Sequence, residues 1–186
     1  MADKTCKTGR RNAKENKYDL SGEYGVGYAS NTGERFYFDL EDYDKLKEHC
    51  WWATRHYMWT YIKGTTKRLS MHRLIMESPD DKEVDHINWK RYDNRKENLR
   101  VCTHQENMMN CPSRKNYSGI TGIVWDENRK LWTARITVEK KNKYLGRFES
   151  KDDAIKARLE AEAKYYGEFA PQRHLFEQYG IKYETN

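Results

Sequence analysis

The sequence contains no long hydrophobic run. Hydrophobic residues make up 37% of the 186 residues and charged residues 34%, and the mean hydropathy is −1.17. No stretch approaches the roughly 20 apolar residues that a helix needs to cross a bilayer. The first 17 residues also lack the apolar segment of a secretory signal. We therefore expect a protein that neither enters a membrane nor is secreted.

Closely spaced cysteine pairs are also absent. The four cysteines, Cys6, Cys50, Cys102 and Cys111, form no C-x-x-C pair of the kind found in zinc knuckles and redox motifs. Cys102, His104 and Cys111 lack a fourth ligand at a spacing that suits zinc. We predict reduced thiols, mostly structural, and exclude a disulfide scaffold.

Aromatic side chains, in contrast, are abundant. The chain carries 14 Tyr, 6 Trp and 5 Phe, too many for a disordered polyampholyte. Its length suits one ordinary domain or two small ones. The composition therefore predicts a folded protein with a small core that is rich in aromatic rings.

Charge is distributed unevenly along the chain. Residues 112–151 contain ten basic and four acidic side chains, a surplus that equals the net charge of +6. Residues 19–48 contain eight acidic and three basic side chains. A basic segment with interspersed Trp and Tyr is typical of nucleic-acid binding. A solubilising charged face would give the same composition.

The first segment, from about Tyr18 to Ser78, predicts a β-rich scaffold. Alternating residues on either side of a Ser-Asn-Thr-Gly turn predict a hairpin. Gly64 separates two further alternating runs. The expected elements are strands at 24–28 and 35–38, a helix at 40–49, strands at 51–62 and 67–71, and a short helix at 72–76 that ends before Pro79.

The second segment, Glu83 to Cys111, predicts a compact ββα unit. A short strand over 84–87 contains adjacent Asp85 and His86, whose side chains leave a regular strand on opposite faces. A polar loop over 88–98 leads to a returning strand over 99–102. Thr103 with Glu106 three residues later has the pattern of a capping box at the start of a helix.

The third segment, Tyr117 to Ala170, predicts three antiparallel strands followed by a helix. The strands are expected at 119–125, 131–138 and 143–148, and Ser150 is expected to cap a helix with an apolar stripe that ends near Gly167. The helix would cover one face of the sheet. The other face would display Thr133, Arg135 and Thr137, rimmed by Trp125, Arg129, Lys130, Lys143 and Arg147.

Together these elements predict an α+β protein with five parts. They are a basic flexible arm (1–17), a scaffold with the ββα unit (18–111, core 83–111), a linker (112–116), the sheet-and-helix domain (117–170) and a C-terminal tail (171–186).

Four sequence runs in the first two segments resemble the HNH nucleases of the homing-endonuclease type. The runs are HRLIM from His72, VDHIN from Val84, DNRKENLR from Asp93 and THQENMMN from Thr103. The final histidine of the eponymous motif is replaced by asparagine. An Asp-His dipeptide or an Asn-rich turn alone is typical of ordinary loops. Their order along the chain carries the resemblance.

The resemblance implies a phosphodiester-cleaving site. His86 would be the general base, Asp85 and Asn107 would bind one divalent metal ion, and Asn98 would brace the loop. A neutral imidazole can accept a proton from water near pH 7. Oxygen ligands favour Mg²⁺ or Mn²⁺ over zinc. We expect His72 to pack the short helix against the ββα unit and not to act in catalysis.

The third segment resembles the APETALA2-type DNA-binding domain. The matching runs are Gly122-Ile, Trp132-Thr-Ala-Arg-Ile, Tyr144-Leu-Gly-Arg-Phe and the Ala-rich helix. Thr121 and Val124 stand where that family tends to place arginines, so its target sequence cannot be transferred. A sheet that only packs on the nuclease unit is the alternative. The expected DNA-binding residues are Arg114, Lys115, Trp125, Arg129, Lys130, Thr133, Arg135, Thr137, Lys143 and Arg147.

The leading hypothesis is a site-specific, metal-dependent DNA endonuclease of mobile-element origin. It would act on double-stranded DNA as a cytoplasmic monomer in a bacterial or phage-infected cell, with no membrane or small-molecule partner. Whether it cuts one strand or both is left open. A DNA-binding regulator with a degenerate nuclease unit is the first alternative, and an RNA-directed binder is the second.

Overall fold

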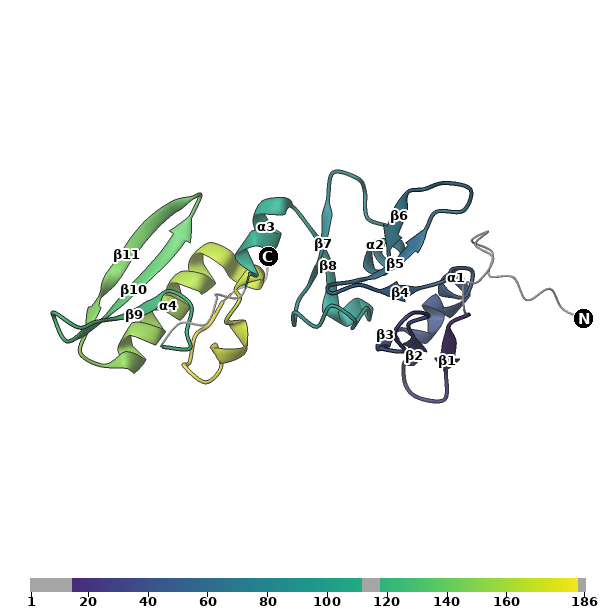
Figure 1. Ribbon diagram of the computed structural model, residues 1–186. Coiled ribbons are helices and arrows are strands. Elements are labelled where there is room, and N and C mark those ends of the chain that lie inside the picture. The colour runs from purple at the N-terminus through teal and green to yellow at the C-terminus, as the bar shows by residue number, and fades with distance from the viewer. Residues whose placement is uncertain (1–14, 112–117, 184–186) are drawn as a thin grey trace, which may run out of the picture. The chain divides into compact units, whose positions relative to one another are not determined.

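The computed structural model describes residues 15–111 and 118–183 (Figure 1). The chain divides into two compact units, 1–104 and 105–186. In the described residues the first unit contains three small antiparallel sheets and the second contains one, each with a few helices, so the predicted α+β class is confirmed. None of the helices in the described part is long and apolar enough to span a membrane. The predicted linker, with Arg114 and Lys115, lies outside the described residues, as do positions 1–14 of the predicted arm.

The first sheet of the N-terminal unit has the strand order β1-β2-β3, with β1 at Lys17–Asp19, β2 at Gly25–Tyr28 and β3 at Arg35–Phe38. On β2, Gly27 lies opposite Phe36 and Gly25 lies opposite Phe38. Both phenylalanine rings are fully buried because the glycines leave room for them. The predicted hairpin is therefore confirmed, and its glycines have a packing role.

The start of this unit differs from the predicted mobile arm. Asn16 donates hydrogen bonds to the carbonyls of Tyr28 and Trp51, both at 2.8 Å, and accepts one from the Trp51 amide at 2.6 Å. Asn16 is thus bonded to the folded unit and Lys17 begins β1, so neither belongs to an arm.

The second sheet has the order β4-β5-β6, with β4 at Trp52–Ala53, β5 at Met58–Tyr61 and β6 at Arg68–Ser70. The single strand predicted over 51–62 is wrong, because the run folds into a hairpin. The Thr54 hydroxyl accepts hydrogen bonds from the amides of His56 and Tyr57, at 3.4 and 3.2 Å. These bonds close a tight turn that contains neither glycine nor proline.

Short helices and a two-stranded sheet complete the N-terminal unit. A 3-10 turn, η1 (Leu40–Asp42), precedes α1 (Tyr43–Leu46), α2 spans Met71–Met76, and β7 (Glu83–His86) pairs with β8 (Leu99–Cys102). Side chains from all three sheets and from both α-helices share one core. The scaffold and the β7–β8 ribbon are consequently a single packing unit.

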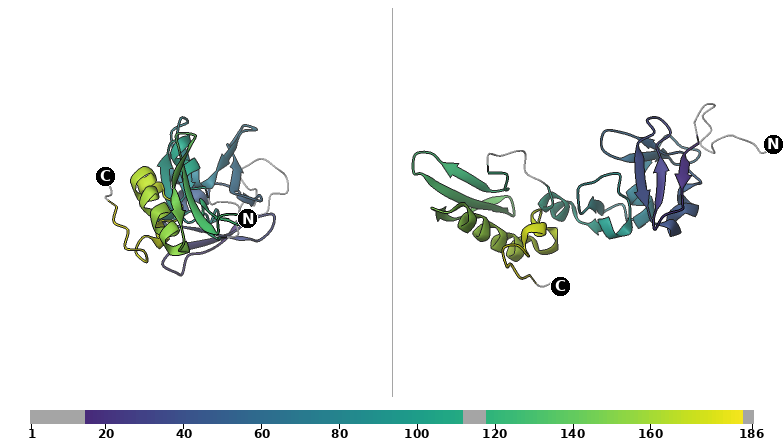
Figure 2. Two further views of the ribbon diagram at one scale, coloured as in Figure 1. Left: turned by 90° about the vertical axis from the view of Figure 1, so that its left-hand side faces the viewer. Right: turned by 90° about the horizontal axis from the view of Figure 1, so that it is seen from below.

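The second unit contains the sheet β11-β10-β9 and the helix α4. The strands are β9 (Ile123–Asp126), β10 (Leu131–Val138) and β11 (Lys141–Phe148), and α4 spans Lys151–Tyr166. Figure 2 shows α4 along one face of the sheet. The Ser150 hydroxyl caps α4 by accepting from the amides of Asp152 and Asp153, as predicted.

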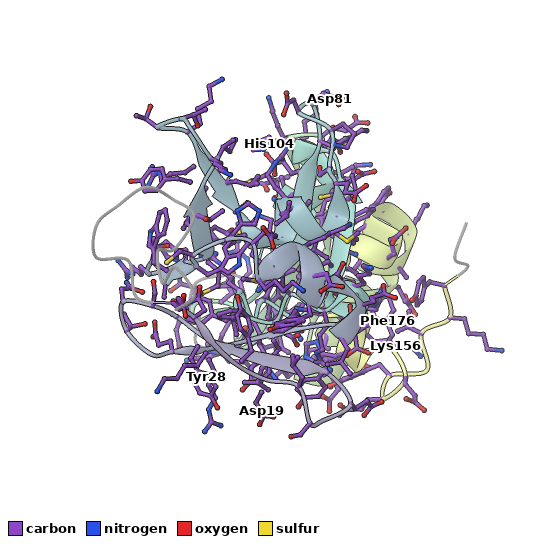
Figure 3. All side chains as sticks on the ribbon, turned by 90° about the vertical axis from the view of Figure 1, so that its right-hand side faces the viewer. Asp19, Tyr28, Asp81, His104, Lys156 and Phe176 are labelled. Carbon is purple, nitrogen blue, oxygen red and sulfur yellow. The ribbon has the colours of Figure 1, made fainter. Side chains whose placement is uncertain are left out.

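Two boundaries in this unit differ from the predictions. Residues 119–122 form turns and not the start of a strand, because Gly119 and Gly122 have φ of 73° and 80°. Residues 171–183, the described part of the segment predicted as a tail, pack into the core. Short 3-10 turns, η3 (Gly167–Phe169) and η4 (Arg173–Leu175), bring buried Gln172 and Phe176 against α4 (Phe176 is labelled in Figure 3).

Candidate active site

The β7–β8 ribbon positions the adjacent residues Asp85 and His86. Its ladder is antiparallel, with Asp85 opposite Arg100 and His86 opposite Leu99. The pairing is regular over these residues. Side chains alternate along a regular strand, so Asp85 and His86 leave it toward opposite faces. They consequently have different neighbours.

The imidazole of His86 is buried, with 4% of its surface exposed. Its Nε2 lies 3.4 Å from Oδ1 of Asn94, in the loop between β7 and β8. Burial lowers the pKa of His86, although the Asn94 contact and the nearby charge of Asp85 oppose the shift. The ring is therefore neutral at pH 7 and can accept a proton.

Two further rings surround His86. The His72 ring lies 5.1 Å away, nearly perpendicular to it, and the Tyr57 ring lies 5.9 Å away. His72 is itself buried and its Nε2 lies 3.1 Å from the Ser70 hydroxyl. Burial lowers its pKa to about 3. His72 thus packs α2 against β7 as an uncharged ring, which agrees with its predicted structural role.

The carboxylate of Asp85 is held by Arg100. The Nε and Nη2 groups of Arg100 donate to Oδ2 of Asp85 at 2.9 and 2.6 Å. Both side chains are at most 10% exposed. Sequence reasoning missed Arg100, whose only signal is its place opposite Asp85 when the two short strands are paired. A cationic group thus contacts the carboxylate that was predicted to bind metal.

Asn98 connects the two sides of the β7–β8 loop. It lies in η2 (Lys96–Asn98), donates to the carbonyl of Asp93 at 2.8 Å, and accepts from the amide of Asn88 at 2.9 Å. The Asp93 carboxylate in turn receives two hydrogen bonds from Arg95, both at 2.8 Å. These contacts connect the beginning, middle and end of the loop that follows β7.

The helix that carries Asn107 begins at the division between the two units. α3 spans His104–Met109, directly after Thr103, where the capping pattern predicted its start. His104, labelled in Figure 3, places Nδ1 2.8 Å from Oε1 of Glu83 on β7. Asn107 is partly exposed and belongs to the C-terminal unit.

In the C-terminal unit, the predicted open face carries exposed polar side chains. On β10, Arg135 and Thr137 are exposed, whereas Thr133 is buried. Arg147 lies opposite Thr133, and Tyr144 lies opposite Arg135. Tyr144 is 59% exposed, and the Arg147 guanidinium lies 5.7 Å from its ring centroid. Tyr144 was not among the residues predicted from the sequence, although its pairing with Arg135 follows from the β10–β11 hairpin.

The other predicted DNA-binding residues that the structure describes lie elsewhere in this unit. The Trp125 ring packs against Trp132 at 5.1 Å, and the Lys143 ammonium lies 4.4 Å from the ring of Tyr165 on α4. Both therefore contact the helix-covered side of the sheet. At the turn between β9 and β10, Arg129 pairs with Asp126 and Lys130 pairs with Glu127.

The cysteines and acidic groups in the described part form no zinc site. Cys50 and Cys102 are buried free thiols, and Cys111 is an exposed one. Within residues 15–111 and 118–183, no three His, Cys, Asp or Glu side chains gather as a metal-binding cluster.

Comparison with known proteins identifies a domain in the middle of the chain. Residues 71–109, from α2 through α3, match the family model described as HNH endonuclease. Over 59 residues the chain is 34% identical to "Protein 3.8" of Escherichia phage T7, a match that covers 31% of this chain and 49% of that protein. The chain thus spans about half the length of this curated relative. No solved structure matches the chain.

Proposed function

We propose that this protein is a metal-dependent DNA endonuclease of the homing type, which nicks or cuts double-stranded DNA. The observation that carries the proposal is the buried, neutral His86 on β7, within the segment that matches the HNH endonuclease family. In this role His86 removes a proton from the attacking water. Asn94, in the loop between β7 and β8, orients the imidazole through its contact with Nε2.

Asp85 and Asn107 are the proposed metal ligands. A carboxylate and a carboxamide supply hard oxygen donors, which suit Mg²⁺ or Mn²⁺, and Mg²⁺ commonly retains several waters and substrate phosphates as further ligands. One bound ion would neutralise charge on the phosphate and stabilise the leaving oxygen. Arg100, which donates two hydrogen bonds to Asp85, fixes the orientation of that carboxylate.

The C-terminal unit is proposed to bind duplex DNA as an APETALA2-type domain does. An antiparallel ribbon fits the major groove of B-DNA, and arginine contacts guanine edges or phosphates. Exposed Arg135, Tyr144 and Arg147 on one face support this role. The segment that matches the HNH family would then cut a site that the β9–β11 sheet selects.

The cleavage assay uses supercoiled plasmid DNA with and without Mg²⁺. We expect nicked or linear product with the full chain and Mg²⁺, and none with His86→Ala. The matched control is His174→Ala, which removes an exposed imidazole in η4 and is expected to cleave normally. Circular dichroism checks that both variants are folded. Cleavage by folded His86→Ala would remove the general-base role from His86.

A DNA-binding regulator with a degenerate nuclease unit is the second candidate. The contact that favours it is the Arg100–Asp85 pair, because a guanidinium already neutralises the proposed metal ligand. The two candidates differ in one measurement. The regulator binds DNA with strong salt dependence but yields no cleavage product with Mg²⁺ or Mn²⁺.

A further inference from the structure

A basic groove of about 620 Å³ lies in the N-terminal unit, among the β2–β3 hairpin, the turn after β4 and the loop after β7. Its lining contains more basic than acidic side chains, and four aromatic rings as well. None of the DNA-binding residues predicted from the sequence belongs to it. The basic lining residues are Arg35, Arg55, His56, Lys90, Arg91 and Arg95.

The two acidic side chains of this groove are engaged by their neighbours. Asp93 receives two hydrogen bonds from Arg95, and Glu34 accepts from the hydroxyl of Tyr92 at 3.4 Å. In the part of the chain that the structure describes, no carboxylate forms an ion pair with Arg55 or Lys90. The groove therefore has positive charge available for an anion.

Arg91 is held in the groove by two aromatic rings. Its Nη1 lies 2.6 Å from Nδ1 of His56, and its guanidinium lies 5.2 Å from the centroid of the Tyr57 ring. An imidazole and a phenol ring fix the position of the guanidinium but do not neutralise it. An arginine placed in this way is suited to bind a phosphate oxygen.

The groove lies close to the proposed general base. Tyr57 contacts Arg91 at 5.2 Å, and its ring centroid is 5.9 Å from that of His86. One aromatic ring thus separates the groove from the imidazole. A nucleic-acid strand carries a phosphate about every 3.4 Å along the duplex axis. A strand whose phosphate reaches His86 therefore has neighbouring phosphates within reach of this groove.

We propose that this groove binds the backbone of the DNA strand that is cut, next to the scissile phosphate. Arg55, Lys90 and Arg91 would contact consecutive phosphates. Trp89, with 39% of its surface exposed, would offer its ring to a base. The inference rests on the proposed nuclease function and adds a backbone contact made by the nuclease unit itself, apart from the β9–β11 sheet.

The first test measures DNA binding by the full chain in EDTA, where no cleavage occurs. The groove variant is Arg55→Gln with Lys90→Gln. The matched control is Lys63→Gln with Lys67→Gln, which removes the same charge from exposed positions outside the groove, between β5 and β6. Fluorescence anisotropy of a labelled duplex gives the Kd at several salt concentrations.

Loss of two phosphate contacts predicts a Kd about tenfold higher at low salt and a slope of log K against log salt smaller by about 1.8. The control pair is expected to change the Kd about twofold or less, since only general attraction is lost. Equal effects of the two pairs would overturn the proposal. Labelled single-stranded DNA and double-stranded RNA, run in parallel, show whether the groove distinguishes the duplex DNA of the proposed function.

The second test uses the unaltered protein. Lysine acetylation is mapped by mass spectrometry with and without duplex DNA, again in EDTA. We expect DNA to protect Lys90 and to leave Lys63 reactive, and equal modification of Lys90 in both samples would refute the groove. Cleavage is scored separately with Mg²⁺. Protection of Lys90 without cleavage would support DNA binding in the groove and refute the nuclease function. Cleavage without protection of Lys90 would support the nuclease function and refute DNA binding in the groove.

Discussion

The imidazole rings of His72 and His86 lie 5.1 Å apart at an angle of 77°, and both are buried. One belongs to α2 and the other to the last position of β7. Protonating both imidazoles to the charged form would be energetically unfavourable, because they are buried and their two positive charges would lie close together. The packing of the two rings therefore requires both to be uncharged, so the free energy of unfolding depends on pH.

The first prediction concerns the stability of the protein in acid. Burial lowers the pKa of His72 to about 3 and also lowers that of His86, whereas both take up a proton near pH 6.5 when the chain unfolds. Below pH 6.5 the unfolded chain binds more protons, so the free energy of unfolding falls as pH falls. Each such histidine contributes about 1.4 kcal/mol per pH unit.

Urea denaturation of wild type and His72→Gln between pH 7 and pH 4 measures this effect. We expect the free energy of unfolding of His72→Gln to depend less steeply on pH than that of wild type, by the equivalent of about one proton, whatever the stability of the variant at pH 7. His174→Gln, which alters an exposed side chain, should follow the wild-type curve. Identical slopes for wild type and His72→Gln would contradict the prediction.

The second prediction concerns the Asp85–Arg100 pair. Arg100→Met leaves the buried carboxylate of Asp85 without its cation, and we expect the free energy of unfolding to fall by about 3 kcal/mol. If Asp85 binds a divalent ion, Mn²⁺ replaces the missing charge and stabilises the folded state. Thermal unfolding with and without Mn²⁺ should therefore show a larger rise in Tm for Arg100→Met than for wild type.

Asp85→Asn is the control for this metal response, because its amide carries no charge. Its Tm is expected to change little with Mn²⁺. If Arg100→Met gains no more from Mn²⁺ than Asp85→Asn does, Asp85 is not a metal ligand.

The third prediction concerns the glycines of β2. A Cβ at Gly27 would lie 2.1 Å from the Phe36 ring, so Gly27→Ala must displace a fully buried side chain. Overpacking of this kind costs about 1–3 kcal/mol. Gly22→Ala adds the same methyl group at an exposed position where the nearest atom would be 3.5 Å away. Urea denaturation should show a loss for Gly27→Ala, and equal midpoints would contradict the packing role.

The fourth prediction concerns a buried charge network around α4. Arg158 donates to Oε1 of Glu162 at 2.9 Å and to the carbonyl of Arg135 at 2.6 Å, while Gln172 donates to Glu162 at 2.7 Å. Arg158→Met leaves a carboxylate buried without its cation, and we expect a loss of about 3–5 kcal/mol.

The double variant Arg158→Met with Glu162→Leu removes both charges and should recover much of that loss. Lys156→Met, on the exposed side of α4, is the control and should be close to neutral. If the double variant is less stable than Arg158→Met alone, the contacts of Glu162 stabilise the fold by more than the burial of its charge costs.

Local patterns in the sequence were sufficient for most of the secondary structure. The Ser150 cap, the alternation along β10 and the glycine-bearing turn before β3 each specify an element through nearest neighbours alone. The turn at Thr54 was missed because a threonine hydroxyl closes it, and that signal is much weaker than glycine or proline.

The candidate site was predictable only in part, because its surroundings come from distant segments. His86 and Asp85 stand out as neighbours in the sequence, but Tyr57 and His72 reach His86 only when two sheets share a core. The Arg100 contact depends on strand register, which cannot be fixed from two runs of four residues. Roles that depend on long-range packing therefore required the structure.

The polar contacts of Gln172 set a limit on how this C-terminal unit can be moved between genes. Its side chain accepts from the amide of Thr121 at 2.7 Å and donates to Glu162, so it joins the first turn of the unit to α4. A recombination event that joins foreign sequence after residue 170 would omit this glutamine and the buried Phe176. The smallest portable version of this unit therefore continues through at least residue 176.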